Sequence, residues 1–225
     1  MPIPDRRHYL ADVIAILKQH WPDNRTVNVV CHGHSVPAGY FATPMVDTFS
    51  AYPHLLHLGL KQRFPFAVIN VIVTAVGGET SDGGAARFED QVLCHQTDVL
   101  TLDYGLNDRG IGLEQAKVAW CSMIEKALEQ DAKVLLLTPT ADISQDQEAA
   151  PEEKSDLQRH AAQIRGLADT YGIGLADSLA AFEQALADQA DLSDLLSWPN
   201  HPNQAGHELV ARELLRWFPI AANLE

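Results

Sequence analysis

The sequence contains few cysteines, and they do not form a motif. Cys31, Cys94 and Cys121 are the three cysteines among 225 residues. No two of them make a Cys-x-x-Cys pair, which excludes a zinc knuckle and a dithiol redox motif. A small, odd number of thiols is typical of a reducing compartment. We therefore expect a cytoplasmic protein.

Basic residues are also scarce. Lysine and arginine number 16, against 30 aspartates and glutamates, so the formal net charge is −14. Nucleic-acid binding needs clustered basic side chains, and so does a polybasic membrane anchor. The charge argues against a nucleic-acid partner and against a membrane partner, and it names no partner of its own.

A long hydrophobic run is absent as well. The most apolar stretch, residues 64–76, is interrupted by Asn70 and Thr74 and is too short to span a bilayer. Near the N-terminus, Asp12 interrupts the apolar residues that follow Arg6 and Arg7. This segment is typical of an amphipathic helix and not of a signal peptide.

Short apolar runs alternate along the chain with segments of helical periodicity. We expect strands over residues 26–31, 66–74, 98–103, 133–138 and 172–177. We expect helices over residues 8–20, 47–62, 83–96, 113–130, 153–170, 178–189 and 204–217, and a polar, mobile loop over residues 141–154. Strands separated by helices of this length form a parallel sheet, and near-continuous apolar strands indicate helices on both of its faces. The sequence predicts a single α/β domain over residues 1–225, with three α/β/α layers and a five-stranded parallel sheet.

Residues suited to acyl transfer follow the predicted strands. Ser35 follows the first strand, Gly78 the second and Asn107 the third, and His201 precedes the last helix. Ligands bind beyond the carboxyl ends of the strands in such sheets. A serine nucleophile needs an imidazole to accept its proton, and the oxyanion that forms needs N–H donors, which a glycine backbone and an asparagine carboxamide supply. This set of residues predicts serine acyl transfer.

Four segments carry a family resemblance. They are Gly33-His34-Ser35-Val36-Pro37-Ala38-Gly39-Tyr40, Gly77-Gly78-Glu79-Thr80, Gly105-Leu106-Asn107-Asp108 and His201-Pro202-Asn203. In this order they resemble the four sequence blocks of the SGNH hydrolases, the wider GDSL esterase/lipase family. The third block, Gly-x-Asn-Asp, is fairly specific, and the ordered set is a strong signal.

The resemblance implies a flavodoxin-like SGNH hydrolase fold and a serine esterase that needs no cofactor and no metal. Ser35 would be the nucleophile and His201 the general base. The main-chain N–H groups of Ser35 and Gly78 and the side chain of Asn107 would form the oxyanion hole. The favoured substrate is a small ester with a short acyl chain, such as an O-acetyl group on a carbohydrate. The alternatives are a thioesterase, a lysophospholipase, an acyltransferase of the same fold, and a binding protein whose active site has decayed.

Two positions depart from the family pattern. His34 stands where the first block has an aspartate. Trp198 stands three residues before His201, where the family has the acid that orients the imidazole. A Ser–His dyad then remains, oriented either by a main-chain carbonyl or by another acid such as Asp194. We hypothesise a carbonyl in the Ser197–Trp198 segment, because the Nδ1–H of a histidine commonly finds such an acceptor.

Other patterns support weaker hypotheses. His32 and His34 alternate on an extended chain, as metal ligands do, but no third ligand has a recognisable spacing. The glycine pairs at 77–78 and 83–84 fit neither a dinucleotide-binding nor a Walker motif. Tyr40, Phe41 and Trp198 are equally compatible with a substrate pocket and with ordinary packing.

Overall fold

The protein has a parallel β-sheet of five strands. The structure, a computed structural model, describes residues 2–145 and 151–220, with side chains for all of them except residues 151–154. The strands run in the order β2-β1-β3-β4-β5, and all neighbours are parallel. They are β1 (Thr26–Gly33), β2 (Val68–Val73), β3 (Val99–Asp103), β4 (Lys133–Leu137) and β5 (Gly174–Ala176). This order is that of flavodoxin-like doubly wound sheets, so the predicted fold class is confirmed.

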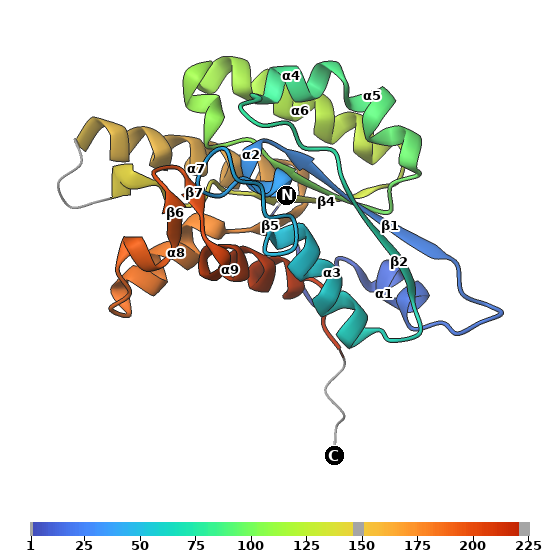
Figure 1. Ribbon diagram of the computed structural model, residues 1–225. Helices are drawn as coiled ribbons and strands as arrows, with labels where there is room; N and C mark the ends of the chain where they lie inside the picture. Colours follow the sequence, from blue (N-terminus) through green and yellow to red (C-terminus); the bar gives the residue numbers. More distant parts are fainter. Residues whose placement is uncertain (1, 146–150, 221–225) are drawn as a thin grey trace.

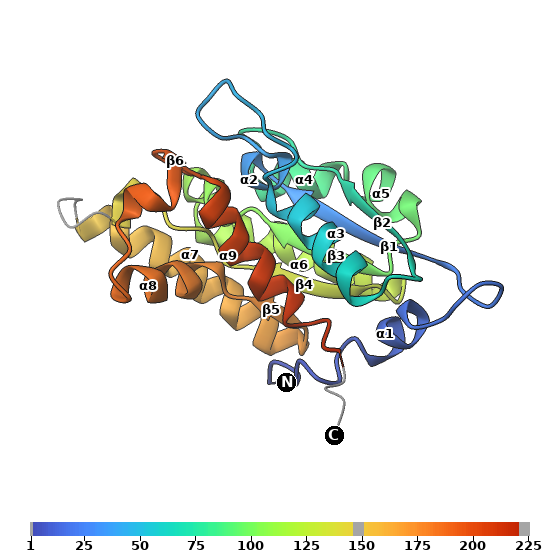
Figure 2. The same ribbon diagram turned by 60° about the horizontal axis from the view of Figure 1, so that its bottom comes forward.

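Helices cover both faces of the sheet and complete three layers (Figure 1). They are α1 (Ala11–Leu17), α2 (Ser35–Ala38), α3 (Tyr52–Arg63), α4 (Ser81–Ala86), α5 (Phe88–Gln91), α6 (Leu113–Glu129), α7 (Pro151–Tyr171), α8 (Ser178–Ala187) and α9 (Gln204–Leu215). One apolar cluster joins α1, α3, α8 and α9 to the sheet, and a second joins α5 and α6 to its other face. Residues of α7 belong to both clusters. Figure 2 shows α9 running beside α3 and α8 on the first face.

The central strand β1 shows why helices cover both faces of the sheet. Val29 and Cys31 are completely buried in the first apolar cluster, and Val30 is completely buried in the second. Successive side chains of a strand point to opposite faces, so an uninterrupted apolar run requires helices on both. Each such side chain contributes about 1.5–3 kcal/mol when it is fully removed from water.

Some boundaries differ from those expected. Helix α3 begins at Tyr52 instead of residue 47, with Pro53 in its first turn, where proline is tolerated. The helix expected over residues 83–96 is divided into α4, α5 and the 3₁₀ turn Leu93–His95. In the loop expected over residues 141–154, residues 143–145 form a 3₁₀ turn and α7 begins at Pro151. Residues 146–150 of this predicted loop lie outside the described residues.

A small hairpin before α9 was not anticipated. Strands β6 (Leu196–Trp198) and β7 (His201–Pro202) pair antiparallel, with Trp198 opposite His201. The hairpin contacts α2, and it thereby brings His201 to the end of β1. In the described part of the chain, no helix is both long enough and apolar enough to cross a membrane.

Candidate active site

Three neighbouring strands deliver the predicted site residues to one edge of the sheet. Strand β1 lies between β2 and β3. Ser35 follows β1, Gly78 follows β2, and Asn107 begins the 3₁₀ turn after β3 (Asn107–Gly110). Because the carboxyl ends of parallel strands lie at the same edge, residues far apart in sequence meet there.

The end of β1 holds Ser35 in a tight turn. The N–H of His34 donates to the carbonyl of Asp103 at 3.2 Å, and the N–H of Val76 donates to the carbonyl of Gly33 at 3.0 Å. A Cβ at Gly33 would lie 2.4 Å from the Asp103 carbonyl oxygen, so only glycine permits this approach. Ser35 is the first residue of α2 and is only 5% exposed.

His201 lies against the Ser35 hydroxyl in the arrangement of a base. Its Nε2 is 3.0 Å from Ser35 Oγ, and its Nδ1 is 2.8 Å from the main-chain carbonyl oxygen of Phe41. A carbonyl can only accept, so Nδ1 carries the hydrogen and Nε2 of the neutral ring offers its lone pair to the hydroxyl. This is the tautomer that a general base requires.

The group that orients His201 differs from the one expected. It is a main-chain carbonyl, as hypothesised, but it belongs to Phe41 and not to the Ser197–Trp198 segment. The Trp198 side chain is 46% exposed. Asp194 was wrongly considered, because its carboxylate caps its own 3₁₀ turn (Leu192–Asp194), where it accepts from the N–H of Asp191 at 3.0 Å.

The Phe41 carbonyl is itself held in place. The Phe41 N–H donates to the Met45 carbonyl at 3.0 Å. The Phe41 ring stacks on the ring of His207, with centroids 5.2 Å apart. His207 is completely buried, and its Nδ1 accepts the N–H of Tyr52 at 3.2 Å. Burial lowers the pKa of His207 to about 3, so this ring is neutral at neutral pH.

Burial also sets the protonation state of His201. It lowers the pKa of His201, the Phe41 carbonyl opposes that effect, and the nearby His34 adds to it. A pKa below the ordinary value leaves His201 neutral at pH 7. The ring is therefore ready to accept a proton.

The N–H groups expected in the oxyanion hole are accessible. Gly78 has a φ of +78°, and a Cβ there would meet nothing within 4 Å, so its amide borders open space. Among the described residues, the N–H groups of Ser35 and Gly78 have no acceptor. The Asn107 carboxamide donates one hydrogen to the Glu79 carbonyl at 3.0 Å, and its second hydrogen remains for a ligand.

A polar network, which sequence reasoning missed, supports this loop. The Glu79 carboxylate accepts from the Arg87 guanidinium at 2.8 Å and from the Tyr104 hydroxyl at 2.9 Å. His32 Nε2 lies 3.0 Å from the same hydroxyl. Burial and the charge of Arg87 lower the pKa of His32 to about 4. The network ties the residue after Gly78 to the core.

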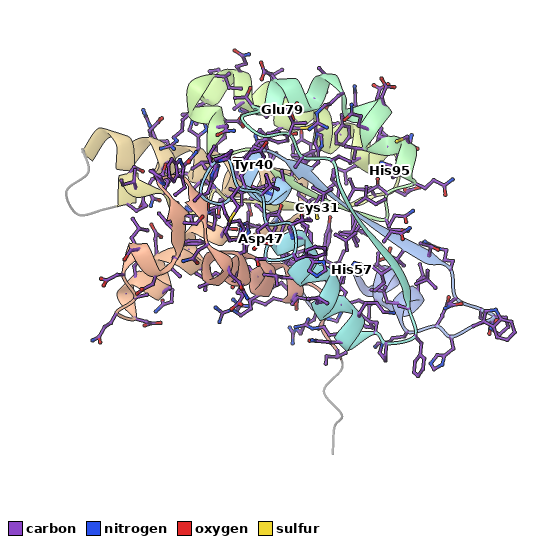
Figure 3. All side chains as sticks on the ribbon, viewed as in Figure 1. Cys31, Tyr40, Asp47, His57, Glu79 and His95 are labelled. Carbon is purple, nitrogen blue, oxygen red and sulfur yellow. The ribbon has the colours of Figure 1, made fainter. Side chains whose placement is uncertain are left out.

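Figure 3 shows Glu79 and Tyr40 near each other over this edge of the sheet. The Tyr40 ring lies against Gly77, where a Cβ would come within 2.9 Å of it, and its centroid is 6.0 Å from that of His201. Tyr40 therefore forms one wall of the site. The same view places His57 and His95 away from it.

The histidines considered as metal ligands have other contacts. His32 bonds to Thr74 and Tyr104, and His34 faces Ser35. Within residues 2–145 and 151–220, no group of three or more His, Cys, Asp or Glu side chains is arranged to hold a metal ion.

Comparison with known proteins identifies the family. The model of the GDSL-like Lipase/Acylhydrolase family matches residues 31–209, a range that contains all four sequence blocks. The chain belongs to this family. It is therefore a carboxylic ester hydrolase, as the sequence predicts.

The relatives of this family member share its architecture at low identity. An acetylxylan esterase from Geobacillus stearothermophilus is 22% identical over 173 residues, which are 71% of this chain and 77% of the relative. A catalytic mutant of Axe2, an acetylxylan esterase from the same organism, superposes with a TM-score of 0.75 at 19% identity over 90% of this chain and 97% of the other. LAE5, an α/β hydrolase from the metagenome of Lake Arreo, gives a TM-score of 0.72 at 21% identity over 85% and 94%.

The catalytic mutants of Axe2 include substitutions of a serine, a histidine and an aspartate three residues before that histidine. In this GDSL-like chain the residue three before His201 is Trp198.

Proposed function

We propose that this esterase hydrolyses short-chain acyl esters through an acyl-enzyme on Ser35, with His201 as general base. The observation that carries the proposal is the 3.0 Å contact between His201 Nε2 and Ser35 Oγ, together with the Nδ1–H bond to Phe41 that leaves Nε2 free to accept. A serine hydroxyl is a weak nucleophile until a neighbouring imidazole takes its proton.

The first half-reaction forms the acyl-enzyme. Ser35 Oγ bonds to the ester carbonyl carbon while its proton passes to His201 Nε2, and the carbonyl π electrons move to the oxygen. The amides of Ser35 and Gly78 and the free carboxamide hydrogen of Asn107 hold this oxyanion. When the tetrahedral species collapses, the bond to the alcohol oxygen breaks and His201 returns the proton to the leaving alcohol.

The second half-reaction repeats these steps with water. A water molecule attacks the acyl carbon and gives its proton to His201. The proton then returns to Ser35 Oγ as the carboxylic acid leaves. Protein groups supply every proton transfer in this sequence, and no cofactor is needed.

The favoured substrate is an acetylated carbohydrate. The names of the relatives support a sugar ester, because two of them are acetylxylan esterases. The Tyr40 ring lies 6.0 Å from the His201 ring, and Trp198, which is paired with His201 in the hairpin, is 46% exposed. A sugar face would have these aromatic surfaces to pack against. The net charge of −14 favours a neutral ester over a strongly anionic one.

The alternatives differ in substrate or in the group that accepts the acyl chain. A thioesterase or a lysophospholipase would use the same Ser35 and His201, and an acyltransferase would replace water with another alcohol. A binding protein with a decayed site is the remaining alternative. In that case the contact between Ser35 and His201 would be present but would not support catalysis.

Two measurements test the proposal. Phosphonate labelling should modify the wild-type protein and not Ser35→Ala, and Ser35→Ala should lose several orders of magnitude in kcat/KM on p-nitrophenyl acetate. A panel of C2 to C8 p-nitrophenyl esters, thioesters and acetylated xylooligosaccharides should show the highest kcat/KM for acetyl groups on sugars. A folded wild-type protein that is neither labelled nor active would establish the binding protein, and a preference for C8 would exclude the acetyl esterase.

A further inference from the structure

Ser35 has a second imidazole beside it. The Nδ1 atom of His34 lies 3.3 Å from Ser35 Oγ, on a side chain that is 1% exposed. His34 occupies the position at which the family's first sequence block has an aspartate. The hydroxyl of Ser35 is therefore within reach of two histidines, His34 and His201.

The contacts of His34 determine where its hydrogen lies. Its Nδ1 accepts the N–H of Val36 at 3.3 Å, so this atom carries a lone pair and the neutral ring has its hydrogen on Nε2. Nε2 lies 3.4 Å from Asp103 Oδ1. This is an ion-pair distance, although the geometry is not that of a well-formed hydrogen bond.

The sheet register brings the carboxylate to this place. Gly33, the last residue of β1, is paired with Asp103, the last residue of β3. The residue that follows Gly33 therefore begins beside Asp103, whose side chain is almost completely buried. Asp103, His34 and Ser35 thus lie next to one another in the order carboxylate, imidazole, hydroxyl.

The two imidazoles differ in the group that contacts the nitrogen farther from Ser35. His201 has a neutral carbonyl on its far nitrogen, and His34 has a carboxylate. A buried carboxylate stabilises an imidazolium more than a carbonyl does, because the interaction of full charges is strong where water is excluded. Buried groups near the pair include the phenol of Tyr52, whose pKa is raised by burial and by the charge of Asp103, and the ring of Tyr104.

We propose that His34 and Asp103 form a second carboxylate–imidazole pair that acts on Ser35, with His34 as an alternative acceptor of the hydroxyl proton. As Ser35 Oγ bonds to the acyl carbon, its O–H bond breaks and an N–H bond forms at His34 Nδ1, which at the same time gives up its hydrogen bond from the Val36 N–H. The Nε2–H then donates a hydrogen bond to the Asp103 carboxylate, and this bond stabilises the imidazolium. When the bond between the acyl carbon and the alcohol oxygen breaks, the proton passes from Nδ1 to that oxygen, and Nδ1 can again accept the Val36 N–H. Asp103 acts through His34 and is a positioning residue, whereas His34 contacts the reacting oxygen.

The test uses kcat on p-nitrophenyl acetate in three backgrounds, and it rests on the proposed function. His201→Ala should keep a kcat about 10²-fold above that of Ser35→Ala, the lower end of the range that one general base contributes. Adding His34→Asn or Asp103→Asn to His201→Ala should remove this residual rate. Asparagine suits position 34, because its side chain also caps α2. Asp103→Asn should lower kcat where His34 is present and have no further effect in a His34→Asn background.

Each outcome decides the matter. A merely structural role of Asp103 predicts the same loss of kcat with and without His34, and that result would overturn the proposal. So would a His201→Ala variant as slow as Ser35→Ala, or a residual rate that His34→Asn leaves unchanged. Thermal unfolding identifies variants that fail to fold. If Asp103→Asn does not fold, the effect of His34→Asn on the residual rate of His201→Ala tests the proposal instead. Failure of the proposed function is recognised separately, by a Ser35→Ala variant with full activity.

Discussion

The Nδ1–H of His201 donates to the main-chain carbonyl of Phe41 over 2.8 Å, across 160 residues of sequence. This bond selects the tautomer and the ring orientation that a base needs. It differs from the carboxylate bond of a complete triad in one respect, since a neutral carbonyl offers a dipole and no charge. Hydrogen bonds to charged groups are roughly twice as strong as neutral ones. In the proposed mechanism, the imidazolium form of His201 is correspondingly less stabilised.

Replacing Trp198 with aspartate tests this difference. A carboxylate near His201 favours the imidazolium, so Trp198→Asp should raise the pKa of His201 by about 1 or more. The acidic limb of the kcat/KM profile should then move to higher pH. Trp198→Asn is the matched control, because it removes the same indole without adding charge, and it should leave the limb in place. An unchanged limb in Trp198→Asp would show that residue 198 does not face the imidazole.

The wild-type profile has its own expected form. Burial lowers the pKa of His201 below its ordinary value of 6.5, and a general base is active when it is neutral. Activity should therefore persist as the pH falls below 6.5 and should decline only at lower pH. The measurement is kcat/KM on p-nitrophenyl acetate from pH 4.5 to 8, since the limb reports the free enzyme. A half-maximal rate above pH 6.5 would contradict the proposed role of burial.

Much of the sheet and most of the candidate site could be predicted from the sequence. The strands are short apolar runs, and the site residues follow them in an order that the family shares. The Phe41 carbonyl could not be predicted, because every residue has a carbonyl and only the fold selects one. The hairpin of β6 and β7 was missed because its strands are very short and β7 contains Pro202. The role of Asp103 depends on its register with Gly33, which the sequence does not show.

The contribution of Asn107 can be measured directly. Asn107→Ala removes the proposed oxyanion donor and the bond to the Glu79 carbonyl. Loss of one such donor typically lowers kcat by about 10²–10³, and KM should change little. Asn70→Ala is the control, because it removes the carboxamide that donates to Asn28 at 2.9 Å on the edge strand, and it should leave kcat unchanged. Equal values of kcat for Asn107→Ala and the wild type would remove Asn107 from the oxyanion hole.

Gly78 and Gly112 form a matched pair. Both have a φ of +78°, and at both a Cβ would meet nothing within 4 Å. Because φ is positive at both positions, an alanine should strain the backbone at each, at a cost of about 1 kcal/mol or more. Only the Cβ of Gly78→Ala would stand in the space proposed for the substrate. Gly78→Ala should lower kcat/KM and Gly112→Ala should not, although both should lose stability by urea unfolding. If both variants lose activity equally, strain and not access is the cause.

His207 links the site to the stability of the protein in acid. Its folded-state pKa is about 3, against an ordinary value of 6.5. Below pH 6.5 His207 binds a proton in the unfolded chain but stays neutral in the folded protein. The free energy of unfolding therefore decreases as the pH falls from 6.5 towards 3. Between pH 7.5 and 5 this single group should remove about 2 kcal/mol of the free energy of unfolding.

His207→Asn removes the titrating ring and keeps an amide that can accept from Tyr52. The variant should be less stable than the wild type at pH 7.5, because the stack on Phe41 is lost. Its free energy of unfolding should nevertheless fall less between pH 7.5 and 5 than that of the wild type, by about 2 kcal/mol in urea titrations. His8→Asn, at an exposed histidine, controls for the number of histidines. If the free energy of unfolding declined equally in the wild type and His207→Asn, His207 would not be held neutral. The Phe41 ring would then stack on an imidazole that becomes charged in acid.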